Sequence, residues 1–283
     1  MKTPDAPTLW GISDLHVAHR LNRELLELVR PRSDDDWLIV AGDVGERSAD
    51  IEAALRLLSE RFARVIWVPG NHELWTPVQD AVQLRGVERY DWLVAMCRRL
   101  GVLTPEDDYP LWAGPGGPVR IAPLLSLYDF TWLAPGTTTR EQSLARAYET
   151  GVVCSDEFQL HADPYPDVAA WCQARVAATE LRLEACPRDV PLVLVSHWPL
   201  VREPTRVLRY PEFAQWCGTK ATADWHRRFR TELVVYGHLH IPSTTVHEGV
   251  RHEEVSLGYP REWQRHGLRP GLMKQLLPRP GAS

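Results

Sequence analysis

The first 75 residues alternate short apolar runs with amphipathic segments, and this alternation constrains the fold more than any other feature of the chain. Three runs have the length and composition of buried strands, at residues 8–13, 37–41 and 65–68. Between them, residues 21–29 and 51–62 place apolar side chains at helical spacing. Strands that alternate with helices predict a parallel sheet in an α/β fold. Such sheets bind ligands at the carboxyl ends of their strands, where this chain places polar residues.

The rest of the chain adds further strands and helices around a less regular middle region. The pattern predicts strands at 119–125, 192–195, 233–236 and 250–257, and helices at 87–100, 138–149 and 167–185. Pieces rich in proline and glycine interrupt residues 75–190. We expect a single domain over residues 1–283, in which an insert at about 75–190 forms loops and a cap over the site.

Five short motifs place metal-binding side chains directly after predicted strands. In chain order they are Asp14-Leu15-His16, Gly42-Asp43-Val44-Gly45, Gly70-Asn71-His72-Glu73, Ser196-His197-Trp198-Pro199 and Gly237-His238-Leu239-His240. Each motif alone is a weak signal, because a D-x-H or an N-H-E occurs by chance in many chains. Together they supply Asp, Asn and His side chains in the number that two neighbouring divalent ions need.

The spacing within these motifs favours chelation. Side chains alternate along a strand, so we expect Asp14 and His16 to point to one side and to bind one ion, with His238 and His240 related in the same way. The two carboxylate oxygens of Asp43 can bridge two cations. Mixed oxygen and nitrogen ligands suit Mn, Fe, Zn, Co or Ni better than Ca.

The order of the five motifs resembles the calcineurin-like metallophosphoesterase superfamily, whose motifs are D-x-H, G-D-x-G, G-N-H-D/E, H and G-H-x-H. The resemblance implies an α/β fold, a four-layer α/β/β/α sandwich of two mixed sheets with helices outside. It also implies two divalent metal ions as cofactors, with manganese the expected metal in vitro. The implied ligands are Asp14, His16, Asp43 and His240 for the first ion, and Asp43, Asn71, His197 and His238 for the second.

The resemblance further assigns a catalytic role to His72 beside Asp43. His72 matches the family's histidine that contacts the phosphate and protonates the leaving oxygen, although it can instead simply support Asn71. Glu73 stands where the family accepts Asp or Glu, and we expect it to orient His72 or a metal ligand.

Other polar residues near predicted strand ends are weaker candidates for substrate binding. They are His19, Tyr128, Asp129, Tyr259 and Arg261. Each has an ordinary structural alternative: a loop or helix-cap residue for His19, loop packing for Tyr128 and Asp129, and a surface ion pair for Arg261.

Charge and hydropathy narrow the classes of partner. The net charge is −5 with no basic run, which argues against nucleic acid. We find no apolar run of about 18 residues and no signal-like start, so we expect no membrane span and a cytoplasmic location. Five dispersed cysteines agree with a reducing compartment. The oligomeric state stays unknown from the sequence.

We therefore expect metal-dependent hydrolysis of a phosphoester by a hydroxide that bridges the two metals. The long insert favours a restricted pocket, and the main prediction is a small phosphorylated substrate, a phosphomonoester. An alternative is a phosphodiesterase that acts on cyclic nucleotides or other small diesters. An alternative of a different class is a metal-holding binding or scaffold protein, because the fold alone does not choose among these functions.

Overall fold

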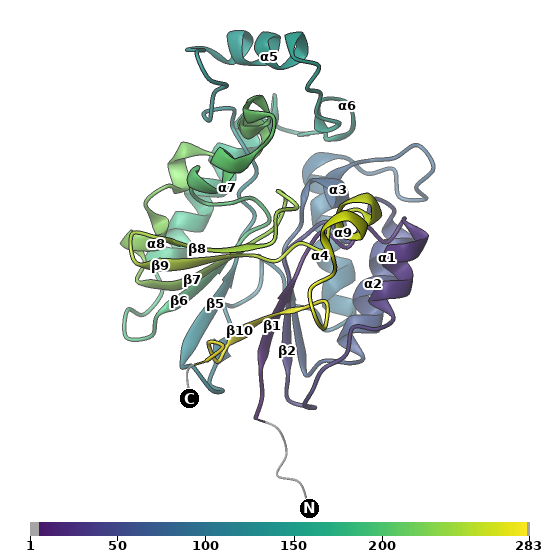
Figure 1. The fold of residues 1–283 in the computed structure, drawn as a ribbon, viewed down its shortest axis with the longest axis vertical. Coiled ribbons are helices and arrows are strands. Elements are labelled where there is room, and N and C mark those ends of the chain that lie inside the picture. Colours follow the sequence, from purple (N-terminus) through teal and green to yellow (C-terminus); the bar gives the residue numbers. More distant parts are fainter. Residues whose placement is uncertain (1–5, 282–283) are drawn as a thin grey trace, which may run out of the picture.

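Two β-sheets lie face to face in the computed structural model, which describes residues 6–281 (Figure 1). The first sheet pairs β1, β2 and β3 in parallel and adds β10 antiparallel to β1. Its strands, in spatial order, are β10 (Lys274–Leu277), β1 (Leu9–Ile12), β2 (Trp37–Val40) and β3 (Arg64–Trp67).

The second sheet is larger and also mixed. Strands β5, β6, β7 and β9 are parallel neighbours, while β4 and β8 pair antiparallel at the two edges. In spatial order the strands are β4 (Leu111–Trp112), β5 (Val119–Pro123), β6 (Leu192–Val195), β7 (Thr231–Tyr236), β9 (Val250–Glu254) and β8 (Ser243–His247).

Helices cover the outer faces of both sheets (Figure 1). The first sheet is flanked by α1 (Arg20–Leu26), α2 (Ser48–Ser59), α3 (Asn71–Leu74), α4 (Gly86–Arg99) and α9 (Pro260–His266). The second sheet is flanked by α7 (Val168–Glu184) and α8 (Trp225–Arg228). The predicted sandwich of two mixed sheets with helices outside is therefore confirmed.

The central strands are apolar on both faces, which explains why they were easy to recognise in the sequence. In β2, Ile39 faces the apolar layer between the sheets, whereas Leu38 and Val40 belong to the cluster under the helices. All three side chains are 0% exposed. Strands buried on both sides lose the usual alternation and become continuous apolar runs.

The middle region differs from the expected insert. Strands β4 and β5 and helices α4 and α7 are parts of the sandwich, so residues 75–190 do not form one cap. Instead, α5 (Arg140–Glu149) and α6 (Asp156–Gln159) project from the layers (Figure 1). Three 3₁₀ helices follow β6, namely η1 (Glu203–Val207), η2 (Pro211–Trp216) and η3 (Lys220–Thr222). We propose that the cap is this shorter segment around α5.

Across residues 6–281, none of the helices combines the length and the apolar character that crossing a membrane requires.

Candidate metal centre

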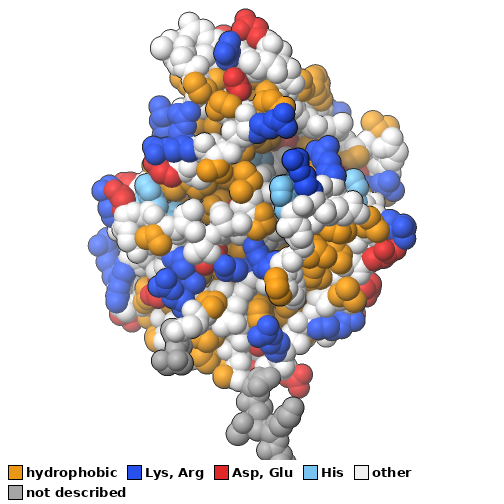
Figure 2. Space-filling view, in the orientation of Figure 1, with side chains coloured by type: hydrophobic (Ala, Val, Ile, Leu, Met, Phe, Trp, Pro, Cys, Tyr) orange, Lys and Arg blue, Asp and Glu red, His pale blue; other side chains and the backbone are white. Residues whose placement is uncertain are grey.

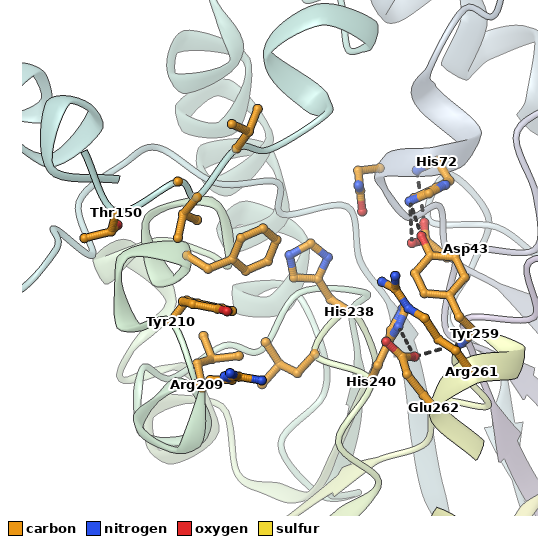
Figure 3. A pocket seen from close by; sticks show the side chains of 17 residues that line it. Asp43, His72, Thr150, Arg209, Tyr210, His238, His240, Tyr259, Arg261 and Glu262 are labelled. Atoms are coloured by element: carbon orange, nitrogen blue, oxygen red, sulfur yellow. Dashed lines mark hydrogen bonds and ion pairs between the residues drawn. The ribbon is translucent and has the colours of Figure 1, made fainter. Parts of the chain in front are cut away.

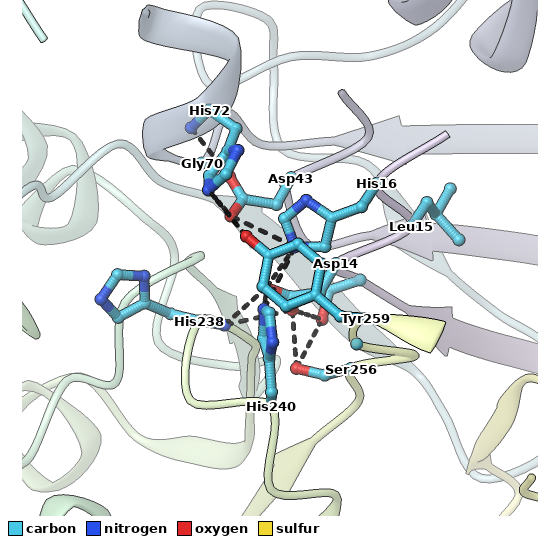
Figure 4. Close-up of polar contacts among 12 residues, drawn as sticks. Asp14, Leu15, His16, Asp43, Gly70, His72, His238, His240, Ser256 and Tyr259 are labelled. Carbon is cyan, nitrogen blue, oxygen red and sulfur yellow. Dashed lines mark hydrogen bonds and ion pairs between the residues drawn. The ribbon is translucent and has the colours of Figure 1, made fainter. Parts of the chain in front are cut away.

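The five motifs meet at one end of the sandwich, where the carboxyl ends of strands from both sheets converge (Figure 4). Asp14 and His16 follow β1, Asp43 follows β2 and Asn71 follows β3, so the first sheet supplies four of the side chains. The second sheet supplies His197 after β6, and His238 and His240 after β7. The site is therefore assembled across the interface between the two sheets.

One half of the site gathers around Asp14. Its Oδ1 lies 3.0 Å from Nε2 of His240, and that nitrogen lies 3.1 Å from Nε2 of His16. Nε2 of His16 is also 4.0 Å from Oδ2 of Asp43. Asp14, His16, Asp43 and His240 thus form one compact group of possible metal ligands.

The other half shares Asp43. Its Oδ2 lies 3.4 Å from Nε2 of His197, which is 3.2 Å from Oδ1 of Asn71. Nδ1 of His238 lies 3.2 Å from the same His197 nitrogen. The structure therefore brings all seven predicted ligands together, with Asp43 between the two halves.

Five of these seven residues have a left-handed backbone, which corrects our explanation of the motifs. The φ angles are 53° at Asp14, 42° at His16, 55° at Asp43, 70° at His238 and 54° at His240. Their side chains therefore converge through tight turns in three loops and not through the alternation of a continuing strand. Each such residue costs about 1–2 kcal/mol, and strain of this kind gathers at functional sites.

Two motif glycines are required by close packing around Asp43. Gly42 has φ +88°, and a Cβ there would lie 2.6 Å from Nδ1 of His197 and 2.7 Å from the backbone nitrogen of Gly70. A Cβ on Gly70 would lie 2.1 Å from Oδ1 of Asp43. Any larger residue at either position would displace a predicted ligand.

Protons balance the carboxylates of this buried group. Burial alone would lower the pKa of His197, but Asp43 and Asp14 raise it to about 9. Burial and the charge on His197 lower the pKa of His238 to about 3. A protonated His197 therefore lies beside a neutral His238. Bound cations would take over the positive charge that the proton on His197 supplies to the two carboxylates.

The donor set fits divalent metal ions. Nδ1 of His16 and Nε2 of His238 are buried and have no hydrogen-bond partner among residues 6–281. The other nitrogen of each ring, Nε2 of His16 and Nδ1 of His238, faces the neighbouring predicted ligands and is the one that a cation in the centre would bind. Carboxylate, amide and imidazole ligands suit first-row transition ions.

His72 lies beside this group and is held by a residue that the sequence analysis missed. Its Nδ1 lies 2.9 Å from Oε1 of Glu46, and its Nε2 lies 3.8 Å from Oδ2 of Asp43 and 3.4 Å from the hydroxyl of Tyr259. Burial lowers the pKa of His72, but Asp43 and Glu46 outweigh burial and hold it above its ordinary value. Because Glu46 occupies Nδ1, Nε2 is the nitrogen that faces Asp43 and the hydroxyl of Tyr259.

Glu73 orients a candidate ligand and not His72. Its carboxylate accepts hydrogen bonds from the backbone N–H groups of Asp43, Val44 and Gly70, at 2.9, 2.7 and 2.8 Å. These three bonds fix the loop after β2 against the loop after β3. Glu73 can therefore orient the predicted metal ligand Asp43, because it binds the backbone N–H of that residue.

Further supporting residues lie outside the motifs. Ser13 and Ser256 each donate to Oδ2 of Asp14 at 2.6 Å. Glu262 of α9 lies 2.8 Å from Nδ1 of His240, and Asp156 of α6 accepts from Nδ2 of Asn71 at 2.8 Å. An acidic residue has no fixed spacing to the ligand that it orients, so Glu262 and Asp156 could not be predicted from the sequence.

A cavity of about 530 Å³ opens onto the centre (Figure 3). His72, Asp43, Tyr259 and Arg261 line one side, and Tyr210 and Arg209 lie across the opening (Figure 3). Residues 150–153 after α5 and Leu208 and Phe213 near η2 complete the second wall. Figure 2 shows basic and histidine side chains near α9, with apolar side chains beneath α5.

The weaker candidates separate into two groups. Tyr259 and Arg261 line the cavity, and the ring of His19 lies 5.4 Å from that of Tyr259 in a neighbouring surface pocket. Tyr128 and Asp129 lie away from the cavity. Tyr128 is 1% exposed and packs against Phe130, and Asp129 accepts hydrogen bonds from the hydroxyls of two threonines.

The family model of calcineurin-like phosphoesterases matches residues 7–242, which include all five motifs. The chain belongs to the calcineurin-like phosphoesterase family. As a member of this metallophosphoesterase family, it is a hydrolase that acts on phosphoester bonds. The family uses two divalent metal ions, and the gathered side chains provide candidate ligands for them.

Relatives within the calcineurin-like phosphoesterases include one match over nearly the whole chain. Acyl-carrier-protein phosphodiesterase PptH from Mycobacterium tuberculosis is 54% identical over 275 residues, which are 97% of this chain and 84% of that protein. The crystal structure of phosphopantetheinyl hydrolase (PptH) from the same organism superimposes with a TM-score of 0.97, at 52% identity and 99% coverage of both chains.

A second relative matches a short region. The symmetrical bis(5′-nucleosyl)-tetraphosphatase of Nitrosospira multiformis is 38% identical over 66 residues, which are 23% of this chain and 24% of that protein. This match covers less than a quarter of either chain.

Proposed function

We propose that this chain hydrolyses the phosphodiester that attaches a phosphopantetheinyl group to an acyl carrier protein. The observation that carries the proposal is the extent of the match to the Mycobacterium tuberculosis protein, 97% of this chain in sequence and 99% in structure. A match of this extent includes the cavity walls as well as the metal centre. Because one fold hosts many substrates, those walls are the part that decides specificity.

This proposal replaces our main expectation of a small phosphomonoester. The name of the relative specifies a diester, so the alternative of a phosphodiesterase agrees better with the comparisons. The diester of the relative belongs to a protein, however, and is neither a cyclic nucleotide nor another small molecule. The alternative of a metal-holding scaffold finds no support, since the family and the relative are hydrolases.

We assign the seven gathered side chains to two metal ions. Asp14, His16, Asp43 and His240 would hold one ion, and Asp43, Asn71, His197 and His238 would hold the other. Two bound ions supply an activated water and neutralise charge on the phosphate. We expect manganese to support the reaction in vitro.

His72 is the proposed general acid. Glu46 occupies its Nδ1, which leaves Nε2 directed toward Asp43 and the hydroxyl of Tyr259 at the cavity wall. Asp43 and Glu46 raise the pKa of His72, which favours the protonated ring. It can then donate to the oxygen that leaves phosphorus, which for this substrate is an alcohol of the carrier protein.

The cavity fits a long, partly apolar group next to a phosphate. Phosphopantetheine carries a branched aliphatic segment beside its phosphate and two amides farther along. Leu208, Phe213 and Val152 give an apolar wall opposite the phosphate end, and Arg261 and Arg209 add positive charge at the opening. Arginine at that opening also favours an acidic protein surface around the scissile group.

The decisive experiment incubates the manganese-loaded protein with a phosphopantetheinylated carrier protein and follows the carrier's mass. We expect the carrier to lose its phosphopantetheinyl group, and chelator to stop the loss. Bis-p-nitrophenyl phosphate and p-nitrophenyl phosphate, assayed beside it, compare simple diester with simple monoester. If the carrier stays unchanged and the monoester is hydrolysed rapidly, the protein is a phosphomonoesterase and the proposal is wrong.

Asp43→Asn provides the inactive control. The substitution keeps the side-chain size, so the variant should fold, but it removes the carboxylate shared by both halves of the centre. We expect it to lose metal and activity together, beyond the roughly 10–100-fold effect of residues that only orient a ligand. Asp189→Asn changes an exposed aspartate in the same way and should leave activity unchanged.

A further inference from the structure

We propose a second metal site, separate from the candidate centre, that binds a zinc-type divalent ion. It is formed by His226, His247 and Glu248, whose possible ligand atoms lie within 4.8 Å of one another, and by the ring of His252 beside them. Figure 1 places α8, β8 and β9 together on the flank of the second sheet, away from α3 and α9 beside the candidate centre. We call these four residues the flank cluster.

The fold brings the flank cluster together from two sequence regions. Strands β8 and β9 form a hairpin in which Thr245 pairs with His252 and His247 pairs with Val250. His247 and His252 are therefore diagonal neighbours on one face of the hairpin. Helix α8 precedes β7 and contacts it, which adds His226 to that face.

The three imidazole rings are spaced as ligands of one ion. Their centroids are 5.0 Å apart for His226 and His247, 5.6 Å for His226 and His252, and 6.0 Å for His247 and His252. Imidazoles bound tetrahedrally at a Zn–N distance of about 2.0–2.1 Å place their centroids roughly 5 Å apart. The interplanar angles of 57°, 70° and 88° exclude stacking. Small rotations of the three histidine side chains would bring one nitrogen of each ring within binding distance of a single ion.

Buried nitrogens without partners point to a missing ligand. His252 is 0% exposed, and neither of its ring nitrogens has a hydrogen-bond partner among the described residues. Within the same residues, Nδ1 of His226 is also buried and unpaired. Each such group costs about 1–3 kcal/mol. A cation in the cluster would accept the lone pair of one ring nitrogen of His252 and remove the cost of leaving that nitrogen without a partner.

The cluster also provides negative charge and an entrance. Oε2 of Glu248 lies 2.9 Å from Nε2 of His226, close to the roughly 3.3 Å between two atoms that bind one zinc ion tetrahedrally. Oε2 of Glu203 lies 3.7 Å from Nε2 of His247. Glu248 is exposed at the hairpin turn, and Figure 2 shows histidine atoms beside acidic atoms on this flank. An ion can therefore enter from solvent.

Glu248 itself has an unusual backbone. Its φ is 46°, and Gly249 after it has φ 85°, so the two residues form a hairpin turn that favours Asn, Asp or Gly at its first position. The backbone of a glutamate is strained in this conformation, which agrees with a role for its carboxylate in the flank cluster.

The test is the zinc content of the full-length protein after equilibrium dialysis against zinc chloride, measured by elemental analysis. We expect His247→Ala to bind one zinc ion fewer per chain than the unaltered protein. Glu248→Gln, at an exposed turn, should weaken the same ion without affecting folding. His161→Ala removes a histidine outside both groups and should leave the zinc content unchanged.

Asp43→Asn separates the two sites in the same experiment. That variant should lose ions of the candidate centre and keep the ion that depends on His247. Circular dichroism of each variant shows that the fold is retained. The proposal is overturned if His247→Ala and Glu248→Gln bind as much zinc, with the same affinity, as the unaltered protein.

Discussion

Nδ1 of His72 lies 2.9 Å from Oε1 of Glu46, so the candidate general acid is oriented by a carboxylate from the loop after β2. The contact fixes which nitrogen faces the cavity. It also adds to the charge of Asp43 in holding the pKa of His72 above its ordinary value. The pair joins two neighbouring motif loops, and its consequences can be measured.

Glu46→Gln should lower the pKa of His72 and weaken general-acid catalysis. In the unaltered protein, His72 stays protonated until the pH rises past its raised pKa, where the rate begins to fall. Without the Glu46 charge, that fall should begin at lower pH, and the rate at neutral pH should drop by roughly 10–100-fold. The pH profile of kcat, with Glu60→Gln at an exposed glutamate as control, measures the shift; coincident profiles would contradict the role.

Gly42→Ala should destabilise the protein more than Gly101→Ala. Both glycines have positive φ, at +88° and +71°, so alanine is strained at each by about 1–2 kcal/mol. A Cβ at Gly101 would meet no described atom within 4 Å, whereas at Gly42 it would press on His197 and Gly70. The difference between the two variants in the free energy of unfolding, measured in urea, therefore gives the cost of the clash at Gly42. Equal losses in the two variants would show that the clash costs nothing.

Tyr210→Ala should raise KM for a phosphopantetheinylated carrier protein while leaving turnover of p-nitrophenyl esters unchanged. Tyr210 lines the cavity wall across from the centre, so a large substrate should contact it and a small ester should not. We expect KM to increase roughly tenfold, which is the effect of losing one contact of moderate strength. Tyr148→Ala is a matched control, since Tyr148 is 48% exposed and Tyr210 is 50% exposed.

The stabilising effect of metal should increase with pH. In the metal-free protein, the pKa of His197 is raised to about 9 by Asp43 and Asp14, against about 6.5 in an unfolded chain. A raised pKa gives stability that is complete below pH of about 6.5 and is lost as the pH rises through about 9. Metal binding instead needs deprotonated histidines and strengthens with pH.

The difference in Tm between manganese-loaded and chelated protein should therefore widen from pH 6.5 to pH 9, the interval between the two pKa values of His197. Differential scanning calorimetry at several pH values measures it. A difference that stays constant or narrows across this interval would contradict the proposed protonation of His197.

Much of the fold could be predicted because its central strands are buried on both faces. Strand β6 has the predicted bounds, and β1, β2, β3 and β7 differ from the prediction by one or two residues at an end. Strand β4 was missed because its two residues are too few to form a pattern, and β8 and β10 were missed as well. Their sequences, STTVH and KQLL, contain few apolar residues, and both lie at sheet edges, where little burial is needed.

The candidate centre was predicted as a set of residues but not as a geometry. Asp14 and His16 were expected to meet through strand alternation, and they meet through left-handed turns. Glu46 and Glu262 were missed because each orients a histidine from another loop or helix. Contacts between distant segments depend on how the elements pack, and local spacing does not encode that information.

The division of the centre between two sheets also has a consequence for synthesis. Asp14, Asp43 and Asn71 leave the ribosome early, whereas His238 and His240 come after all but the last part of the second sheet. A nascent chain can fold its first sheet and helices but cannot complete a metal-binding set until β7 has been made. If His238 and His240 are metal ligands, metal loading reports that translation has passed β7, and a fragment that ends before β7 lacks one ligand of each ion.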